Sequence, residues 1–455
     1  MKKLALILAA LLVALTALFA FAACNNDDGT GAPALTMLSA SGKDIVDESG
    51  AKVALRGTNF GGWLVQEGWM CPTKQTDTLS SDMTLYSRFG KEKAEALIAA
   101  YQESWITEGD FKTVKELGLN VVRVPFTYMN VYHHLSDKGE LLHPDEFTLR
   151  EDPFERLDFA LEMCKKYGLY LILDMHGAVG SQNGSDHSGD TSRTNLYADT
   201  ELGEAYREKT AELWALVAEH FAGESNVAGY DLLNEPTRAS GATQWDYYDV
   251  LYKAVREADP DHMIFIEAIW EPGDLPSPED YGWENVVYEY HHYNWVNTNG
   301  SNTTNYLFYL SKRLNDDRED HGVPVLIGEF NAWGDESRHI GKLDQTDLEA
   351  NAGVLEFYNG EGWHWTTWTY KVVVNSLFGI KYSNWGLYNC YIGRTDAAKI
   401  NPKTDSYEDI LAAWSSVDTA EHFTLYSDFA DIVSAAAAAP FAQGAPKGGY
   451  SILGT

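Results

Sequence analysis

Two glutamates lie at positions typical of reactive side chains, each at the end of a short apolar run. Glu235 follows the run 227–233 within Asn-Glu-Pro, and Glu329 follows the run 323–327 within Gly-Glu-Phe. An ionisable carboxyl at the mouth of a buried strand costs free energy unless something uses or satisfies it. Two such carboxyls predict a pair of carboxylates aimed at one cleft, which is the arrangement that cleaves glycosidic bonds.

Strand-like runs and helical patterns alternate along the chain and would position these two glutamates. The strand-like runs span residues 54–59, 121–125, 170–174, 227–233, 263–267, 286–290, 324–328 and 363–368. The helical patterns span residues 91–104, 107–117, 153–167, 201–221, 245–258, 304–317, 346–359 and 407–414. This alternation predicts an α/β fold, a (β/α)8 TIM barrel, preceded by a hairpin that turns near Gly50. A doubly wound sheet is disfavoured because Gly57, Gly61 and Gly62 do not match the Gly-rich phosphate turn.

Reactive side chains in such a barrel lie at the carboxyl ends of the strands. Besides the two glutamates, the residues at or after predicted strand ends that could do chemistry are Asn59, Trp63, Glu67, Arg123, His176, Asn234, Glu267, His291, Tyr293 and Trp368. Arg123 lies between two valines, and a guanidinium in an apolar strand needs a carboxylate partner. We expect Arg123 to keep Glu329 ionised and oriented, with a purely structural ion pair as the alternative.

A metal site is the main alternative to the two-glutamate chemistry. Asp174 and His176, with the pair His291 and His292, could supply ligands, but no further ligand at a suitable spacing is evident. Strand alternation also places His292 on the face opposite to His291, which favours a structural role for His292. We therefore expect no metal and no cofactor.

The composition limits the classes of partner. The formal charge of -33 disfavours nucleic acids, whose phosphates the chain would repel, and disfavours binding of the folded domain to an anionic membrane. The 14 tryptophans and 26 tyrosines give modest support to a carbohydrate site, because sugars stack on aromatic rings. We expect a monomer.

The N-terminus has the features of a targeting segment. A basic start, an apolar stretch and two alanines precede Cys24, which predicts a signal peptide over residues 1–23. The wording before Cys24 is similar to a bacterial lipoprotein processing site, so we expect a secreted or lipid-anchored surface protein with a tether over 24–36; plain secretion is the alternative. A catalytic domain over 37–420 and a C-terminal helical extension with a tail over 421–455 complete the predicted organisation. The sequence allows a disulfide between Cys71 and Cys390 but does not show one.

Several motifs, taken together and in order, resemble glycoside hydrolase family 5, a member of the large retaining clan. They cover about residues 45–420, and they are Leu-Arg-Gly-Thr-Asn-Phe-Gly-Gly-Trp-Leu at 55–64, Val-Arg-Val-Pro at 122–125, His-Gly-Ala-Val-Gly-Ser-Gln-Asn-Gly at 176–184, Asn-Glu-Pro at 234–236, His-x-Tyr at 291–293, Gly-Glu-Phe at 328–330 and Trp-Thr-Tyr-Lys at 368–371. The first and third of these are most similar to the exo-β-1,3-glucanase branch. The segments 295–304 and 372–385 depart from the fungal exo-enzymes, so exo action and the linkage stay open.

The resemblance implies a retaining hydrolase of β-linked glucans, of the β-1,3-glucanase or glucosidase type. It implies that Glu235 is the acid/base, for which we expect a raised pKa, and that Glu329 is the nucleophile. The residues that it implies for substrate binding are Glu67, Arg123, His176, Asn234, His291, Tyr293 and Trp368. The alternatives are the same mechanism on cellulose, mannan, β-1,6-glucan or a glycolipid, and a surface carbohydrate-binding lipoprotein without catalysis.

Overall fold

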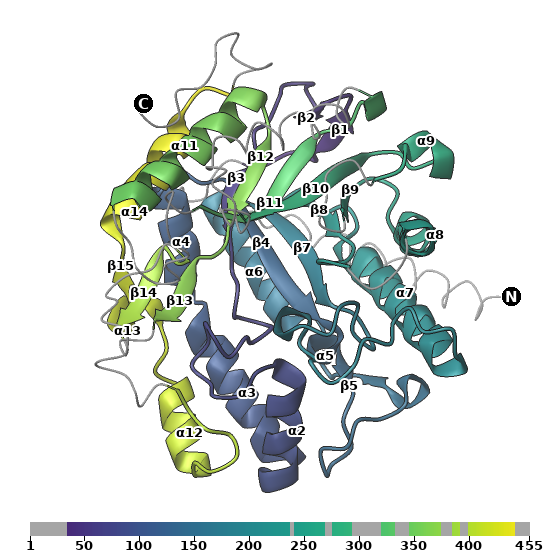
Figure 1. The fold of residues 1–455 in the computed structure, drawn as a ribbon, viewed down its shortest axis with the longest axis vertical. Helices are drawn as coiled ribbons and strands as arrows, with labels where there is room; N and C mark the ends of the chain where they lie inside the picture. The colour runs from purple at the N-terminus through teal and green to yellow at the C-terminus, as the bar shows by residue number, and fades with distance from the viewer. Residues whose placement is uncertain are drawn as a thin grey trace, which may run out of the picture. The chain divides into compact units, whose positions relative to one another are not determined.

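Eight parallel strands close into a barrel in the computed structural model, which describes residues 34–236, 241–268, 275–293, 320–332, 345–374, 385–391 and 399–441 (Figure 1). The barrel strands are β3 (Arg56–Asn59), β4 (Val121–Thr127), β7 (Tyr170–Gly177), β8 (Val227–Asp231), β9 (Met263–Glu267), β10 (Val286–Tyr293), β11 (Val325–Asn331) and β12 (His364–Thr367). They follow one another around the barrel in chain order, and β12 pairs with β3 to close it. The predicted (β/α)8 barrel is thus confirmed.

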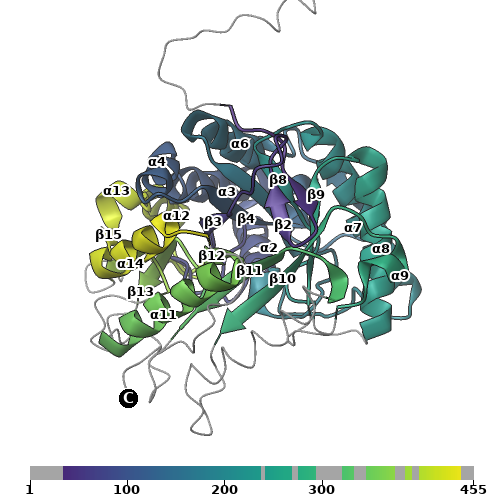
Figure 2. The same cartoon turned by 90° about the horizontal axis from the view of Figure 1, so that it is seen from above.

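Helices lie outside these strands, as the two views show (Figures 1 and 2). The longer helices are α2 (Thr78–Phe89), α3 (Lys91–Trp105), α4 (Glu108–Glu116), α6 (Glu155–Tyr167), α7 (Glu201–Phe221), α8 (Gly241–Ala258), α11 (Gln345–Glu361), α12 (Tyr407–Trp414) and α14 (Ser427–Ala438). The short helices are α5 (Tyr128–Val131), α9 (Pro278–Tyr281) and α13 (Thr419–His422), with single 3₁₀ turns η1 (Pro144–Glu146) and η2 (Asp186–Ser188). The helix predicted at 304–317 lies outside the described residues. Across the part of the chain that is described, every helix is too short or too polar to cross a membrane.

Short strands lie outside the barrel. They are β1 (Ser39–Ser41), β2 (Asp44–Val46), β5 (Tyr132–His133), β6 (Thr148–Leu149), β13 (Lys371–Val374), β14 (Tyr388–Tyr391) and β15 (Thr424–Leu425). The hairpin expected near Gly50 is present as a short turn: Val46 bridges Lys52 antiparallel, and the N–H of Asp47 donates to the carbonyl of Ala51. The other edge of β2 pairs with β1.

Alternation along the strands sorts their side chains into two layers. In β4, Val122 and Val124 face outward into the large cluster shared with the helices, whereas Val121 joins an inner apolar cluster with residues such as Ile172 and Phe265. Side chains two residues farther along each strand point to the same inner side, one level nearer the carboxyl ends. Arg123, two residues after Val121, therefore lies inside the barrel above an apolar floor.

The C-terminal helix α14 lies beside α11, the helix that precedes the last barrel strand. The Nη1 atom of Arg56 donates to the carbonyls of Ala437 and Ala439, and the Nδ2 atom of Asn359 donates to the carbonyl of Ala436. The first barrel strand is thereby tied to the end of α14.

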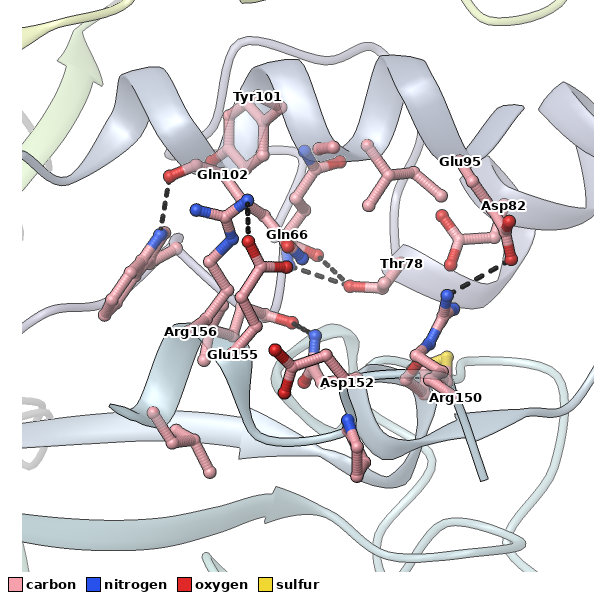
Figure 3. A pocket seen from close by; sticks show the side chains of 18 of the residues that line it. Gln66, Thr78, Asp82, Glu95, Tyr101, Gln102, Arg150, Asp152, Glu155 and Arg156 are labelled. Atoms are coloured by element: carbon pink, nitrogen blue, oxygen red, sulfur yellow. Dashed lines mark hydrogen bonds and ion pairs between the residues drawn. The ribbon is translucent and has the colours of Figure 1, made fainter. Parts of the chain in front are cut away.

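A cavity of about 190 Å³ lies between α2, α3 and the chain leading into α6 (Figure 3). Glu95, Asp82 and Arg150 lie at one end of the cavity, and Glu155 and Arg156 lie at the other. Only 6% of Asp82 is exposed, and burial raises the pKa of its carboxyl to about 7, against the opposing effect of Arg150.

We expect Asp82→Asn to make the free energy of unfolding less dependent on pH. A carboxyl whose pKa is raised in the folded state stabilises the protein when protonated, and this contribution is lost as the pH rises through about 7. The free energy of unfolding of the variant, measured in urea relative to the wild type, should therefore be about 2–3 kcal/mol higher at pH 8 than at pH 5. The exposed Asp152, which lines the same cavity, provides the control Asp152→Asn. Parallel pH curves for wild type and Asp82→Asn would contradict the assignment.

Candidate active site

Arg123 occupies the inside of the barrel and is completely buried. Its guanidinium contacts a carboxylate from each of four other strands, which is more than the single partner that the sequence predicts. The distances are 3.1 Å from Nη1 to Asp174 Oδ2, 2.7 Å from Nη2 to Asp231 Oδ2, 3.3 Å from Nε to Glu289 Oε1 and 3.1 Å from Nη1 to Glu329 Oε1. Arg123 also donates to the side-chain oxygens of Asn59 and Asn234. One cation therefore orients the polar layer of the whole barrel.

The four carboxylates do not share this cation equally. Burial opposes ionisation of Asp174, but Arg123 and His176 outweigh it and lower the pKa of Asp174. Burial, reinforced by the charge of Glu289, raises the pKa of Asp231 well above its ordinary value. At Asp231, burial and the neighbouring carboxylate therefore outweigh the opposing effect of Arg123.

Glu329 is held from two sides at the end of β11. Its Oε1 atom accepts from Arg123, and its Oε2 atom accepts from the hydroxyl of Tyr293 at 2.7 Å. The preceding Gly328 is required by packing, because a Cβ atom at that position would collide with the carboxylate of Glu289. The Gly-Glu order thus lets β11 pass close to β10 and present Glu329 to the barrel mouth.

Glu235 lies just beyond β8, with a backbone φ of 43° that L residues seldom adopt. Its N–H donates to Glu267 Oε2 at 2.6 Å, and its carbonyl accepts from Asn183 Nδ2 at 3.1 Å. These bonds fix the unusual backbone, and strain of this kind is typical of functional sites.

Glu235 and Glu329 both face the imidazole of His291. Its Nδ1 atom lies 2.8 Å from Glu235 Oε1 and 3.5 Å from Glu329 Oε2. These two oxygens are therefore no more than about 6.3 Å apart, which is shorter than the roughly 6.5–9.5 Å of an inverting carboxyl pair. This bound is compatible with the roughly 5–5.5 Å separation of a retaining pair.

The charge state of Glu235 differs from the sequence prediction. Burial by itself would raise its pKa, but the imidazoles of His187 and His291 outweigh burial and lower the pKa of Glu235 to about 2. The raised pKa predicted for Glu235 is therefore wrong for the free enzyme. The carboxylates of Glu267 and Glu329 in turn outweigh burial at His291 and raise its pKa well above the ordinary value, so the proton near Glu235 resides on an imidazole.

The remaining predicted residues lie around the same pocket. The ring of His176 stacks on that of Trp368 with 5.3 Å between centroids. Its Nδ1 atom donates to Asp174 Oδ2 at 2.6 Å. Asn234 leads directly into Glu235. The structure thus brings together Arg123, His176, Asn234, Glu235, His291, Tyr293, Glu329 and Trp368.

Glu67 reaches the pocket from the loop after β3. Its Oε2 atom accepts from Trp69 at 2.8 Å, whereas its Oε1 atom is buried and has no hydrogen-bond partner among the described residues. Burial, together with the nearby carboxylate of Asp186, raises the pKa of Glu67 well above its ordinary value.

His292 lies apart from these residues. Its Nδ1 atom contacts the hydroxyl of Tyr358 on α11, behind the barrel wall. The four metal ligands considered from the sequence therefore do not converge. Cys71 and Cys164 are free, buried thiols, so Cys71 does not form the disulfide that the sequence left open.

Sequence reasoning missed three partners of Arg123 and one partner of Glu235. Asp174, Asp231 and Glu289 are inward-facing acids on buried strands, and strand alternation could have found Asp174 and Glu289, two residues from the inward-facing Ile172 and Val287. The partner of Glu235 is His187, in a loop where no periodicity points to it.

A barrel whose mouth holds two close carboxylates is the architecture of a retaining glycosidase. The family model Cellulase (glycosyl hydrolase family 5) matches residues 86–372, so the chain belongs to glycosyl hydrolase family 5 and is a glycoside hydrolase. It is 29% identical over 358 residues to a beta-xylosidase of Phanerodontia chrysosporium, covering 74% of this chain and 71% of that protein. It is 30% identical over 330 residues to a probable glucan 1,3-beta-glucosidase A of Aspergillus fumigatus, covering 68% and 70%.

Solved structures share the fold. An endogalactoceramidase aligns with a TM-score of 0.54 at 17% identity, covering 88% of this chain and 85% of the other. A rutinosidase from Aspergillus niger aligns with a TM-score of 0.52 at 19% identity, covering 73% and 95%. At these identities the two structures support the fold alone.

Proposed function

We propose that this glycoside hydrolase cleaves β-linked glucans with retention of configuration, with Glu329 as nucleophile and Glu235 as acid/base. The observation that carries the proposal is the placement of both carboxylates within 3.5 Å of one ring nitrogen of His291. A pair this close supports a covalent glycosyl-enzyme intermediate.

The chemistry proceeds in two displacements. Glu329 attacks the anomeric carbon while the bond to the leaving oxygen breaks, and Glu235 passes to that oxygen a proton shared with its imidazole partners. Water then attacks the glycosyl–Glu329 ester, giving up its proton to Glu235, and releases the sugar. Tyr293 and Arg123 hold the Glu329 carboxylate in line for both attacks.

Asn234 is suited to the sugar 2-hydroxyl. Its Oδ1 atom is occupied by Arg123, and its buried Nδ2 atom has no hydrogen-bond partner among the described residues. A buried donor without an acceptor costs free energy, and this cost is relieved when the sugar 2-hydroxyl accepts its hydrogen bond. The bond contributes most to catalysis if it is strongest in the transition state. Trp368, beside His176, offers a wall against which the sugar ring can pack.

The similarity to proteins named as glucan 1,3-beta-glucosidases favours a β-1,3-linked glucan as the substrate. The same machinery would act on cellulose, mannan, β-1,6-glucan or a glycolipid if the loops that shape the outer subsites differ. A carbohydrate-binding lipoprotein without catalysis is disfavoured, since both carboxylates and their partners are present.

The test is a set of reducing-sugar assays on laminarin, cellulose, mannan and pustulan, with product configuration followed by NMR. We expect turnover of laminarin, with the β-anomer formed first. Initial formation of the α-anomer would overturn the retaining mechanism. Turnover of another polymer but not of laminarin would overturn the assignment of a β-1,3-linked glucan as the substrate.

We also propose that the mature chain is exported and held at the cell surface by a lipid on Cys24. Residues 1–33 lie outside the described part of the chain, and the proposal rests on the sequence before Cys24. The same assays, run on washed cells and on culture medium, should find the activity on the cells. Activity in the medium alone would indicate plain secretion.

A further inference from the structure

His187 is the second imidazole at Glu235, and nothing in the two-glutamate chemistry accounts for it. It lies in η2, in the loop that follows β7. Its Nε2 atom is 3.0 Å from Glu235 Oε2, while His291 occupies Glu235 Oε1 at 2.8 Å. Each oxygen of the carboxyl therefore has its own imidazole, and the carboxyl cannot rotate without losing one of them.

The Nε2 atom of His187 has partners for both of its protonation states. Asn183 Nδ2 lies 2.7 Å from it, and Asn183 Oδ1 accepts from the N–H of Ser185, which fixes the Asn183 amide with Nδ2 toward the ring. A protonated Nε2 donates to Glu235 Oε2, and an unprotonated Nε2 accepts from Asn183 or from a protonated Glu235. Nε2 therefore keeps one hydrogen-bond partner in each state, Glu235 when it is protonated and Asn183 when it is not.

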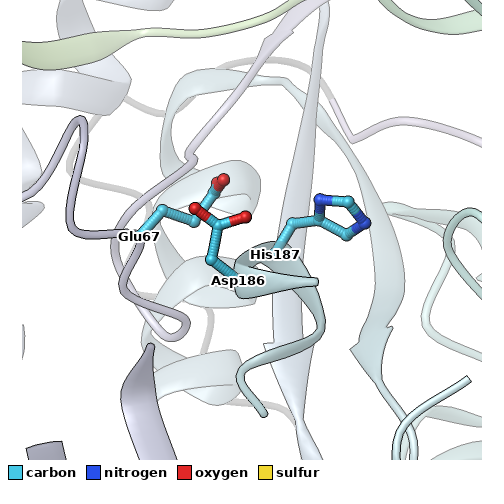
Figure 4. A group of neighbouring side chains, drawn as sticks. All are labelled: Glu67, Asp186 and His187. Atoms are coloured by element: carbon cyan, nitrogen blue, oxygen red, sulfur yellow. The ribbon is translucent and has the colours of Figure 1, made fainter. Parts of the chain in front are cut away.

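Acidic groups also lie near His187. Glu67, Asp186 and His187 each place one oxygen or nitrogen atom within 4.8 Å of the others, and Figure 4 shows the Glu67 and Asp186 carboxylates side by side next to His187. The ring of His176 is a further titratable neighbour, with 6.2 Å between centroids. His187 thus lies near both the acid/base and the carboxylates of Glu67 and Asp186.

We infer that His187 is a positioning residue that fixes the Glu235 carboxyl and keeps a transferable proton at Glu235 Oε2 for the leaving group. The inference rests on the proposed function of Glu235. In the first displacement the proton moves from His187 Nε2 through Glu235 to the departing oxygen as the glycosidic bond breaks. The carboxylate left on Glu235 is then ready to take a proton from water.

The test compares kcat/KM for aryl β-glycosides that differ in the basicity of the departing phenol. A 2,4-dinitrophenolate leaves without a proton, whereas an alkyl-substituted phenolate requires one. We expect His187→Asn and His187→Phe to lower kcat/KM about 10- to 100-fold for the poor leaving group and to leave the dinitrophenyl substrate within about threefold of wild type. The control His220→Asn removes an exposed histidine that pairs with Asp158, and should alter neither substrate.

Glu235→Ala separates the inference from the proposed function. If Glu235→Ala does not lower kcat/KM selectively for the substrate with the poor leaving group, the assignment of the acid/base is wrong. If Glu235→Ala shows this selectivity but the His187 variants lower kcat/KM equally for both substrates, His187 has only a structural role and the inference is overturned. Unchanged kinetics for both His187 variants would overturn it as well.

Discussion

Glu329→Ala is expected to lower kcat by at least about 10⁴-fold, because the attacking group of the first displacement is removed. Folding should survive the change, since Arg123 keeps its contacts with Asp174, Asp231 and Glu289. Hydrolysis of an activated aryl glycoside, together with the thermal unfolding midpoint, measures the two effects separately.

Azide provides the sharper readout in the same variant. The space left by the carboxylate admits a small anion, which attacks the anomeric carbon as the phenolate departs. The product is then a glycosyl azide of inverted configuration, detectable by NMR, because only one displacement takes place. Glu116→Ala, at an exposed glutamate on α4, is the matched control and should behave as the wild type. Wild-type turnover by Glu329→Ala, or a retained azide product, would remove Glu329 from the nucleophile role.

The fold could be predicted from the sequence because each barrel strand is buried on both faces. Every residue of β4 and β7 is buried, so their apolar runs are continuous and stand out against amphipathic helices. The helix α2 was missed because its sequence mixes serine, threonine and aspartate with few apolar residues. Its first turn is stabilised by Asp77, which accepts from the N–H of Ser80, and this is a local signal that a search for apolar periodicity overlooks.

A site residue could be predicted from the sequence only where it lies at or just after the end of a recognisable strand. Glu235 and Glu329 each follow their own strand, and their convergence follows from barrel closure. The charge state of Glu235 depends instead on His187, which is 48 positions earlier in the sequence and reaches the carboxyl only through a loop. A pKa is set by such neighbours across the barrel, and strand periodicity gives no information about them.

Arg123→Met is expected to be among the most destabilising single changes in the protein. Four carboxylates converge on this guanidinium, and the side chains of Asp174, Asp231 and Glu289 are fully buried. Breaking a buried ion pair by removing one partner costs about 3–5 kcal/mol, because an uncompensated charge stays in the interior. Activity should fall together with stability, since Glu329 and Asn234 both lose the group that orients them.

The dependence of this loss on pH distinguishes charge from packing. Without the guanidinium, the buried carboxyls hold their protons more tightly in the folded state than in the unfolded state. Their contribution to stability is then present at low pH and is lost as the pH rises, so the deficit of Arg123→Met relative to wild type should be smaller at pH 5 than at pH 8. Urea unfolding at the two pH values measures it. Arg156→Met, which removes a partner of the exposed Glu103 and Glu155, should cost no more than about 1 kcal/mol at either pH. A deficit of Arg123→Met that is the same at both pH values would mean that lost packing, rather than the unbalanced carboxylates, governs the barrel interior.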